Sequence, residues 1–120
     1  MSNPPTRRRI SSGGPFEAVA GYSRAIAVGD GCWVAGTTDA GPDGRSLHPG
    51  DLSGQTRAAL AIIESALAEA GFSLADVVRT RMFLTDISRA GEVTAIHGEV
   101  FGAVRPAATL VEVSGLIEPS

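Results

Sequence analysis

Apolar positions over residues 51–70 follow a helical period. One stripe recurs at spacings of three and four residues, formed by Leu60, Ile63, Leu67 and Ala70. Asp51 or Ser53 can cap the beginning of this segment, and Gly71 stands where a glycine often follows the end of a helix. The pattern therefore predicts a helix of about five turns over residues 51–70.

A second helix is predicted over residues 88–103. At about 100° per residue, its apolar positions gather on one side: Ala90, Val93, Ile96, His97, Val100, Phe101 and Val104. Asp86 or Ser88 can cap its beginning, and Pro106 ends it, because proline cannot continue a helix.

Five segments have strand-like patterns: residues 7–10, 23–28, 32–37, 77–85 and 107–113. The turn Gly29-Asp30-Gly31 joins two of them as a β-hairpin, and glycine-rich residues 38–50 form a loop. This order of strands and helices predicts an α+β fold with two helices on one face of a mixed sheet. Residues 1–6 are interpreted as a flexible tail, and residues 7–120 as a single domain.

Composition agrees with one small globular domain and limits its partners. The 120 residues are 43% hydrophobic and 19% charged, with a net charge of -3. All ten basic residues are arginines, so a lysine Schiff base is excluded. A mildly acidic chain does not attract nucleic acid or an anionic membrane through its overall field. Arg7–Arg9 could grip RNA phosphates, but a solvated strand end is the more common reading of three arginines.

Cys32 is the only cysteine, which excludes an intramolecular disulfide and fits a reducing compartment. We expect it to be a buried, unreactive thiol. No apolar segment resembles a signal peptide or approaches the ~20 residues of a membrane span. We therefore expect a soluble cytoplasmic protein.

No motif for a cofactor or metal is present, and we expect neither. The two histidines have different surroundings. His97 lies on the apolar side of its helix, either as a buried imidazole bonded to backbone beside Val93 and Phe101, or as a pocket acid or base. His48 precedes Pro49 in a loop and is expected to be solvated.

Two charged residues near the last strand are candidates for a site. Glu112 interrupts an apolar strand, so it is expected to face a cleft or an arginine. Arg105 precedes Pro106 and could clamp a ligand carboxylate. It could equally pair with a neighbouring subunit, with Glu99 or with Glu112.

Short segments spread over the chain together resemble the RidA/YjgF family, also known as L-PSP endoribonuclease-like. They are Gly21-Tyr22-Ser23, Val34-Ala35-Gly36-Thr37, Gln55-Thr56-Arg57, Arg81-Met82-Phe83-Leu84-Thr85-Asp86, Arg105-Pro106-Ala107 and Val111-Glu112-Val113. The resemblance implies a chorismate-mutase-like α+β fold and a homotrimer with sheets inward, helices outward and a small-molecule pocket at each subunit interface.

The archetypal members of this family hydrolyse 2-imino acids to 2-keto acids and ammonia. By this resemblance Tyr22 lines the pocket, Gly36 supplies backbone contacts and Thr37 lies beside it. Thr94 stands where the second helix often carries an asparagine, and Glu112 is the tentative catalytic residue that would orient water.

The chain departs from the archetype at the pocket. Ala108 occupies the place of the arginine that binds the substrate carboxylate, and Leu110 that of a common pocket cysteine. The pattern therefore resembles the arginine-less branches of the family. Family members continue beyond this point into a final strand with a catalytic glutamate, so we expect that the domain as given is one strand short.

Three functions follow from these residues. The first is a protein that binds a small metabolite between subunits, with imine or enamine hydrolysis as its reaction. The second is a non-catalytic binding or sensing protein with the same pocket, which the apolar Ala108 and Leu110 favour. The third and weakest is an endoribonuclease.

Overall fold

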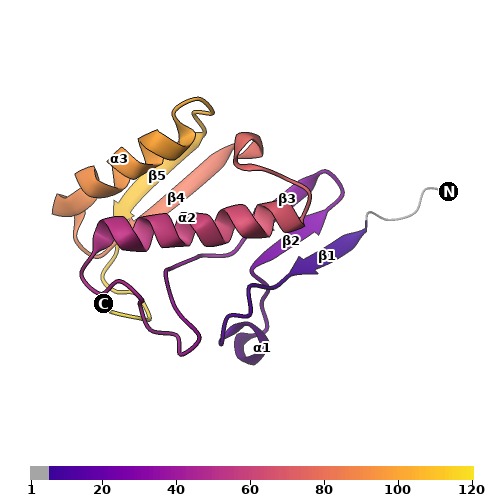
Figure 1. The fold of residues 1–120 in the computed structure, drawn as a ribbon, viewed down its shortest axis with the longest axis horizontal. Helices are drawn as coiled ribbons and strands as arrows, with labels where there is room; N and C mark the ends of the chain where they lie inside the picture. Colours follow the sequence, from indigo (N-terminus) through magenta and orange to yellow (C-terminus); the bar gives the residue numbers. More distant parts are fainter. Residues whose placement is uncertain (1–5) are drawn as a thin grey trace.

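The fold has five strands and two long helices (Figure 1). The structure is a computed structural model that describes residues 6–120, so most of the predicted tail lies outside the described residues. The strands are β1 (Arg7–Ile10), β2 (Ala25–Val28), β3 (Gly31–Val34), β4 (Arg79–Leu84) and β5 (Ala107–Glu112). The helices are α1 (Glu17–Ala20), α2 (Leu52–Glu69) and α3 (Ala90–Phe101), with 3-10 turns η1 (Leu74–Asp76) and η2 (Ile87–Arg89).

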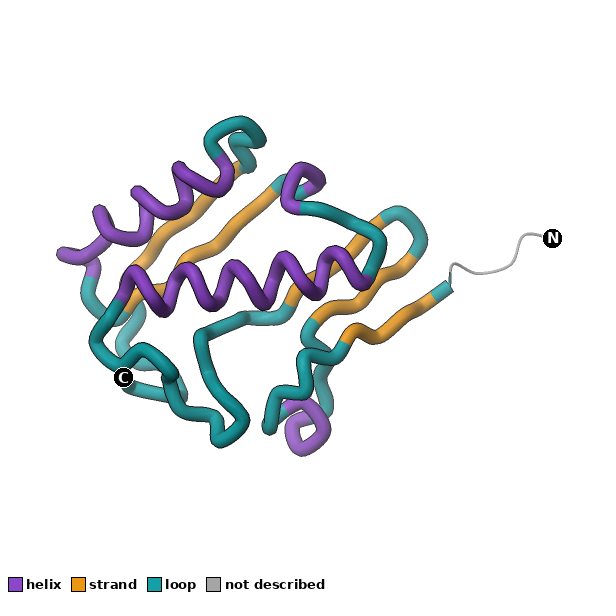
Figure 2. The backbone as a smooth tube through the Cα atoms, in the orientation of Figure 1, coloured by secondary structure: helices purple, strands orange, loops and turns teal. Residues whose placement is uncertain are grey.

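The strands form two separate sheets. β1, β2 and β3 pair antiparallel in that order, whereas β4 and β5 pair parallel to each other. Figure 2 shows α2 and α3 together on one side of the strands. The predicted α+β class with two helices on one face is therefore confirmed, with its strands divided between a three-stranded and a two-stranded sheet.

Side chains alternate between the two sides of each strand and so define a helix side and an open side. On the helix side of the first sheet, Ile10, Ala25 and Ala27 pack against Ala66 of α2 and against Ala70, which caps the end of this helix. We call the opposite face the open side. Its members, from strand register, are Arg7, Arg9, Ile26, Val28 and Trp33 in the first sheet and Arg79, Arg81, Phe83, Thr109 and Val111 in the second.

Helix α2 matches its prediction to within a residue at each end. The Asp51 carboxylate accepts a hydrogen bond from the Gly54 backbone N–H at 3.0 Å, which satisfies one of the unpaired donors of the first turn. Gly71 follows the helix with a φ of 89°, a conformation that glycine adopts without the cost that a side chain would bring.

Helix α3 is shorter than predicted by two residues at each end. Asp86 accepts a hydrogen bond from the Ser88 N–H and so stabilises the 3-10 turn η2, from which α3 continues. Val93, Ile96 and Phe101 are its buried residues. Within residues 6–120 no helix is long and apolar enough to cross a membrane.

Candidate functional site

Arg24, which directly precedes β2, is the centre of a buried polar cluster. The residue is 7% exposed. Its Nη1 donates to the Gly36 carbonyl at 2.5 Å and to Thr37 Oγ1 at 3.0 Å. Its Nη2 lies 3.4 Å from Tyr22 Oη, and the guanidinium carbon is 5.5 Å from the centre of the Tyr22 ring. The cluster joins the three residues that the resemblance placed in a pocket, and sequence reasoning missed its central arginine.

This cluster also explains where β3 ends. The predicted strand over residues 32–37 stops at Val34, and beyond it the Gly36 carbonyl accepts from Arg24 instead of from a neighbouring strand. Thr37 in turn donates to the Ala35 carbonyl at 2.8 Å. Residues 36 and 37 are therefore held in a fixed loop beside the sheet.

Glu17 of α1 supplies the negative charge near Arg24. Its Oε2 accepts hydrogen bonds from Ser12 Oγ and the Gly14 N–H at 2.9 Å each, and from the Ser12 N–H at 3.3 Å. Ser12 Oγ also lies 3.4 Å from Arg24 Nε, so one hydroxyl connects the two charges. Burial alone would raise the pKa of Glu17, but these hydrogen bonds outweigh it and lower the pKa below its usual value.

A cavity of about 590 Å³ lies beside the cluster. Among the residues that line it are Arg7, Arg9, Glu17, Tyr22, Trp33 and Ala35. Arg7 and Arg9 make no side-chain hydrogen bond or ion pair within residues 6–120, whereas Arg8 between them bonds to α2. The cavity therefore combines two aromatic rings with two guanidinium groups that have no protein partner in the described part of the chain.

The β5 candidates occupy a different part of the molecule. In register, Ala108, Leu110 and Glu112 lie beside Thr80, Met82 and Leu84 of β4, on the side of the second sheet that α3 covers. Glu112 Oε1 accepts a hydrogen bond from the Ile87 N–H at 3.1 Å. Within residues 6–120 the Glu112 carboxylate bonds to this backbone N–H and to no arginine, and it helps to hold the turn η2.

Thr94 and Arg105 are exposed and make contacts only within their own segment. Thr94 Oγ1 donates to the Gly91 carbonyl of α3 at 3.3 Å. Arg105 has a positive φ of 53°, and its Nε donates to the Gly102 carbonyl at 3.2 Å. The two acidic partners considered for Arg105 are taken elsewhere, since Glu99 pairs with Arg57 at 2.8 Å and Glu112 with backbone.

His97 is partly buried between α3 and β4. Its Nε2 lies 2.9 Å from Thr80 Oγ1, and its ring is 4.8 Å from that of Phe101, measured between ring centres. The predicted packing beside Phe101 is confirmed, but the hydrogen-bond partner is a side chain rather than backbone.

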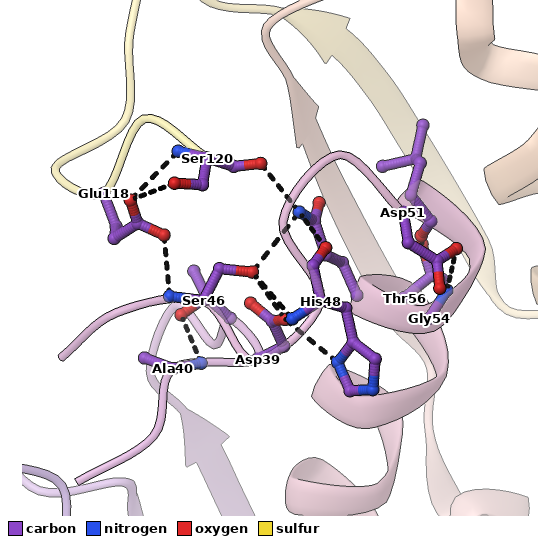
Figure 3. Close-up of polar contacts among 12 residues, drawn as sticks. Asp39, Ala40, Ser46, His48, Asp51, Gly54, Thr56, Glu118 and Ser120 are labelled. Atoms are coloured by element: carbon purple, nitrogen blue, oxygen red, sulfur yellow. Dashed lines mark hydrogen bonds and ion pairs between the residues drawn. The ribbon is translucent and has the colours of Figure 1, made fainter. Parts of the chain in front are cut away.

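His48 is partly solvated, as predicted, but its ring also contacts a buried carboxylate. Its Nδ1 is 3.1 Å from Oδ2 of Asp39, a carboxylate that is 4% exposed, although the imidazole itself is 40% exposed. The same oxygen accepts from Ser46 Oγ at 2.7 Å and from the His48 N–H at 2.8 Å (Figure 3). Asp39 therefore holds Ser46 and His48 in place within the loop over residues 38–50, for which the sequence predicts no regular structure.

The Asp39 loop is tied to the end of the chain and to α2. Glu118 accepts a hydrogen bond from the Ser46 N–H at 2.7 Å, as Figure 3 shows. Gln55 donates to the carbonyls of His48 and Ser120, both at 2.9 Å. No group of three or more potential metal ligands occurs in the part of the chain that the structure describes.

The expected site residues thus fall into two groups. Tyr22, Gly36 and Thr37 meet around Arg24 beside the first sheet. The other group consists of Thr94, Arg105, Ala108, Leu110 and Glu112, which belong to α3, the segment after it and β5 of the second sheet. Within residues 6–120 no hydrogen bond or ion pair joins the two groups.

These features define a two-layer α+β domain in which two helices cover strands arranged in two sheets. The family model "Endoribonuclease L-PSP" matches residues 14–120. The chain belongs to this family, which is also known as the RidA/YjgF family.

Relatives agree with this assignment. An uncharacterized protein of Streptomyces coelicolor is 40% identical over 111 residues, covering 92% of this chain and 82% of the relative. A RutC family protein of Pyrococcus abyssi is 38% identical over 79% of this chain and 75% of its own length. The crystal structure of a Mycobacterium tuberculosis member of the YjgF/YER057c/UK114 family has a TM-score of 0.85 and 49% identity, covering 95% of this chain and 90% of that one.

Proposed function

We propose that this protein binds a small metabolite in a pocket completed by a second copy of the chain, and that it hydrolyses an imine or enamine there. The observation that carries the proposal is the separation of the two residue groups. Tyr22, Gly36 and Thr37 adjoin one sheet, whereas Ala108 and Leu110 belong to the other. Ala108 and Leu110 lie on the side of the second sheet that α3 covers, but β5 has a free edge in this two-stranded sheet. A second copy of the chain can approach them at that edge and so bring the half-sites together.

The open side supports an assembly. Trp33 is 65% exposed there and Phe83 50% exposed, which is unusual for large apolar side chains on a stable monomer surface. The two-stranded parallel sheet is also covered on one face only, whereas parallel strands are normally covered on both. We propose a homotrimer with the open sides inward, as the family resemblance implies.

The proposed reaction needs polarisation of a C=N bond and a placed water molecule. The Tyr22 hydroxyl can donate to the substrate. Gly36 is exposed, and because its carbonyl is bonded to Arg24, its backbone N–H is the group that can donate to the substrate as well. Glu112 uses Oε1 for the Ile87 N–H, which leaves Oε2 to accept from an attacking water. Addition of water to the imine carbon followed by loss of ammonia gives the carbonyl product.

The test is release of ammonia and 2-keto acid from freshly generated 2-imino acids. An amino-acid oxidase with catalase produces the imine continuously, and semicarbazide traps what remains unhydrolysed. The protein is expected to lower the trapped fraction in proportion to its concentration, and Tyr22→Phe to weaken this effect. A trapped fraction equal to that in buffer, for aliphatic and aromatic imines alike, would remove the hydrolase proposal.

Non-catalytic binding is the second candidate, because Ala108 and Leu110 present apolar side chains where the archetype has an arginine and a cysteine. Under this alternative, metabolites raise the melting temperature without being consumed. RNA cleavage has the least support, since the acidic chain of net charge -3 does not favour a polyanion. Any ribonuclease activity is expected to disappear on further purification.

A further inference from the structure

We propose that Tyr22 and Arg24 form an oxyanion-binding pair, which takes over the role left open by Ala108. In this pair the phenol and one guanidinium N–H donate to a carboxylate or enolate oxygen of the ligand. The inference rests on the pocket proposed above. It assigns the positively charged group of that pocket to Arg24, the residue that precedes β2.

A count of donors shows what Arg24 has to offer. A guanidinium carries five N–H groups. The Nε hydrogen points to Ser12 Oγ, and the two hydrogens on Nη1 bond to Gly36 and Thr37. Nη2 carries two hydrogens, and within residues 6–120 its single contact is the 3.4 Å approach to Tyr22 Oη. One Nη2 hydrogen therefore has no acceptor within residues 6–120, and Tyr22, which this group contacts, lines the cavity.

Tyr22 has a donor to offer at the same place. Its oxygen accepts from Arg24 Nη2, so the phenol hydrogen is free to point away from the guanidinium, and no acceptor for it occurs in the described structure. The side chain is 38% exposed and lines the 590 Å³ cavity. Two donors on neighbouring groups are the arrangement that a carboxylate binds well.

The surrounding charge favours an anion. Arg7 and Arg9 line the same cavity without a side-chain partner in the described part of the chain. Glu17 is the one carboxylate in the lining, and the hydrogen bonds from Ser12 and Gly14 already neutralise part of its charge. Arg24 itself is fixed by its other contacts, so little side-chain freedom is lost when it binds a ligand.

The experiment compares two stable probes, 2-oxobutanoate and its neutral amide 2-oxobutanamide, by ligand-observed NMR titration. The intact protein is expected to bind the anion about tenfold more tightly than the amide, the effect of one charge-assisted hydrogen bond. Tyr22→Phe and Arg24→Gln are expected to remove most of this preference. The matched control is Arg57→Gln, because Arg57 is an exposed arginine of α2 that pairs with Glu99.

Arg24→Gln risks unfolding, because the residue is buried. Circular dichroism is therefore recorded for each variant. If Arg24→Gln does not fold, the binding preference of Tyr22→Phe decides whether the pair is correct. Equal binding of the two probes, absence of binding by both, or an unchanged preference in Tyr22→Phe would overturn the pair. Imine hydrolysis is measured on the same samples. If the variants lose the preference for the anion but the parent protein shows no hydrolysis, the hydrolase proposal is wrong and the pair stands. If the parent protein hydrolyses imines and Tyr22→Phe leaves the rate unchanged, the pair is wrong and the hydrolase proposal stands.

Discussion

The imidazole Nδ1 of His48 lies 3.1 Å from the buried Oδ2 of Asp39, and this contact fixes the loop before α2. Replacement of Asp39 by Asn should lower the free energy of unfolding at pH 7 by about 1–3 kcal/mol, because buried donors lose a charged acceptor. Urea denaturation measures this difference. An Asp39→Asn variant as stable as the parent protein would show that the contact adds nothing.

The same variant gives a prediction about pH. Burial alone would raise the pKa of Asp39, but hydrogen bonds from Ser46 and His48 hold it below its usual value of about 3.9. A lowered folded-state pKa stabilises the protein above the unfolded-state pKa, and this contribution is lost as the pH falls through the folded-state value. The stability difference between the parent and Asp39→Asn should therefore shrink in acid. Asp43→Asn, which replaces an exposed carboxylate of the same loop, is the matched control.

Cys32 should react slowly with thiol reagents in the folded protein. The residue packs against the core of the first sheet, and burial raises the pKa of its thiol, so less thiolate is present at neutral pH. We expect a reaction with Ellman's reagent at least about tenfold slower than in 6 M guanidinium. Equal rates in the two conditions would mean that the thiol is accessible.

The hydrogen bond between Thr80 and His97 should stabilise the second sheet against α3. Thr80→Val removes the hydroxyl but keeps the shape, and is expected to cost about 1 kcal/mol in urea denaturation. Thr94→Val is the matched control, because that threonine is exposed on α3 and bonds only within its own helix. Equal losses in the free energy of unfolding for Thr80→Val and Thr94→Val would show that the hydrogen bond to His97 adds no stability of its own.

The open side should be where subunits meet. Trp33→Arg adds a charge next to Ile26 on the open side and is expected to shift the protein from trimer to monomer in light scattering. Ala68→Arg places the same side chain on an exposed position of α2 and should leave the trimer intact. A monomeric parent protein, or a trimeric Trp33→Arg variant, would contradict this arrangement.

The local patterns of the sequence predicted most of the secondary structure. The stripe ending at Ala70 and the glycine after it located α2 closely, because helix period and capping depend on neighbouring residues. The predicted strand over residues 32–37 is longer than the observed one. Its last part contains the Gly36 carbonyl, which accepts a hydrogen bond from Arg24, twelve residues away in the sequence. Division of the strands into two sheets likewise depends on contacts between distant segments, which no local pattern records.

The site was predicted less completely. Arg24 is the second residue of the predicted strand over residues 23–28. The argument that singles out Glu112, a charge within a predicted strand, therefore also points to Arg24, which is buried. No comparable signal existed for Asp39 and His48. Their pairing spans a loop rich in glycine and proline, where hydrophobic periodicity carries no information.

The two sheets also differ in how the chain has to build them. Only residues 29 and 30 connect β2 to β3, whereas η2 and α3 lie between β4 and β5 in the sequence. Contacts between distant segments form late, because the connecting chain must first be ordered. We therefore expect amide hydrogens of the β2–β3 hairpin to gain protection from exchange earlier during refolding than those that link β4 to β5.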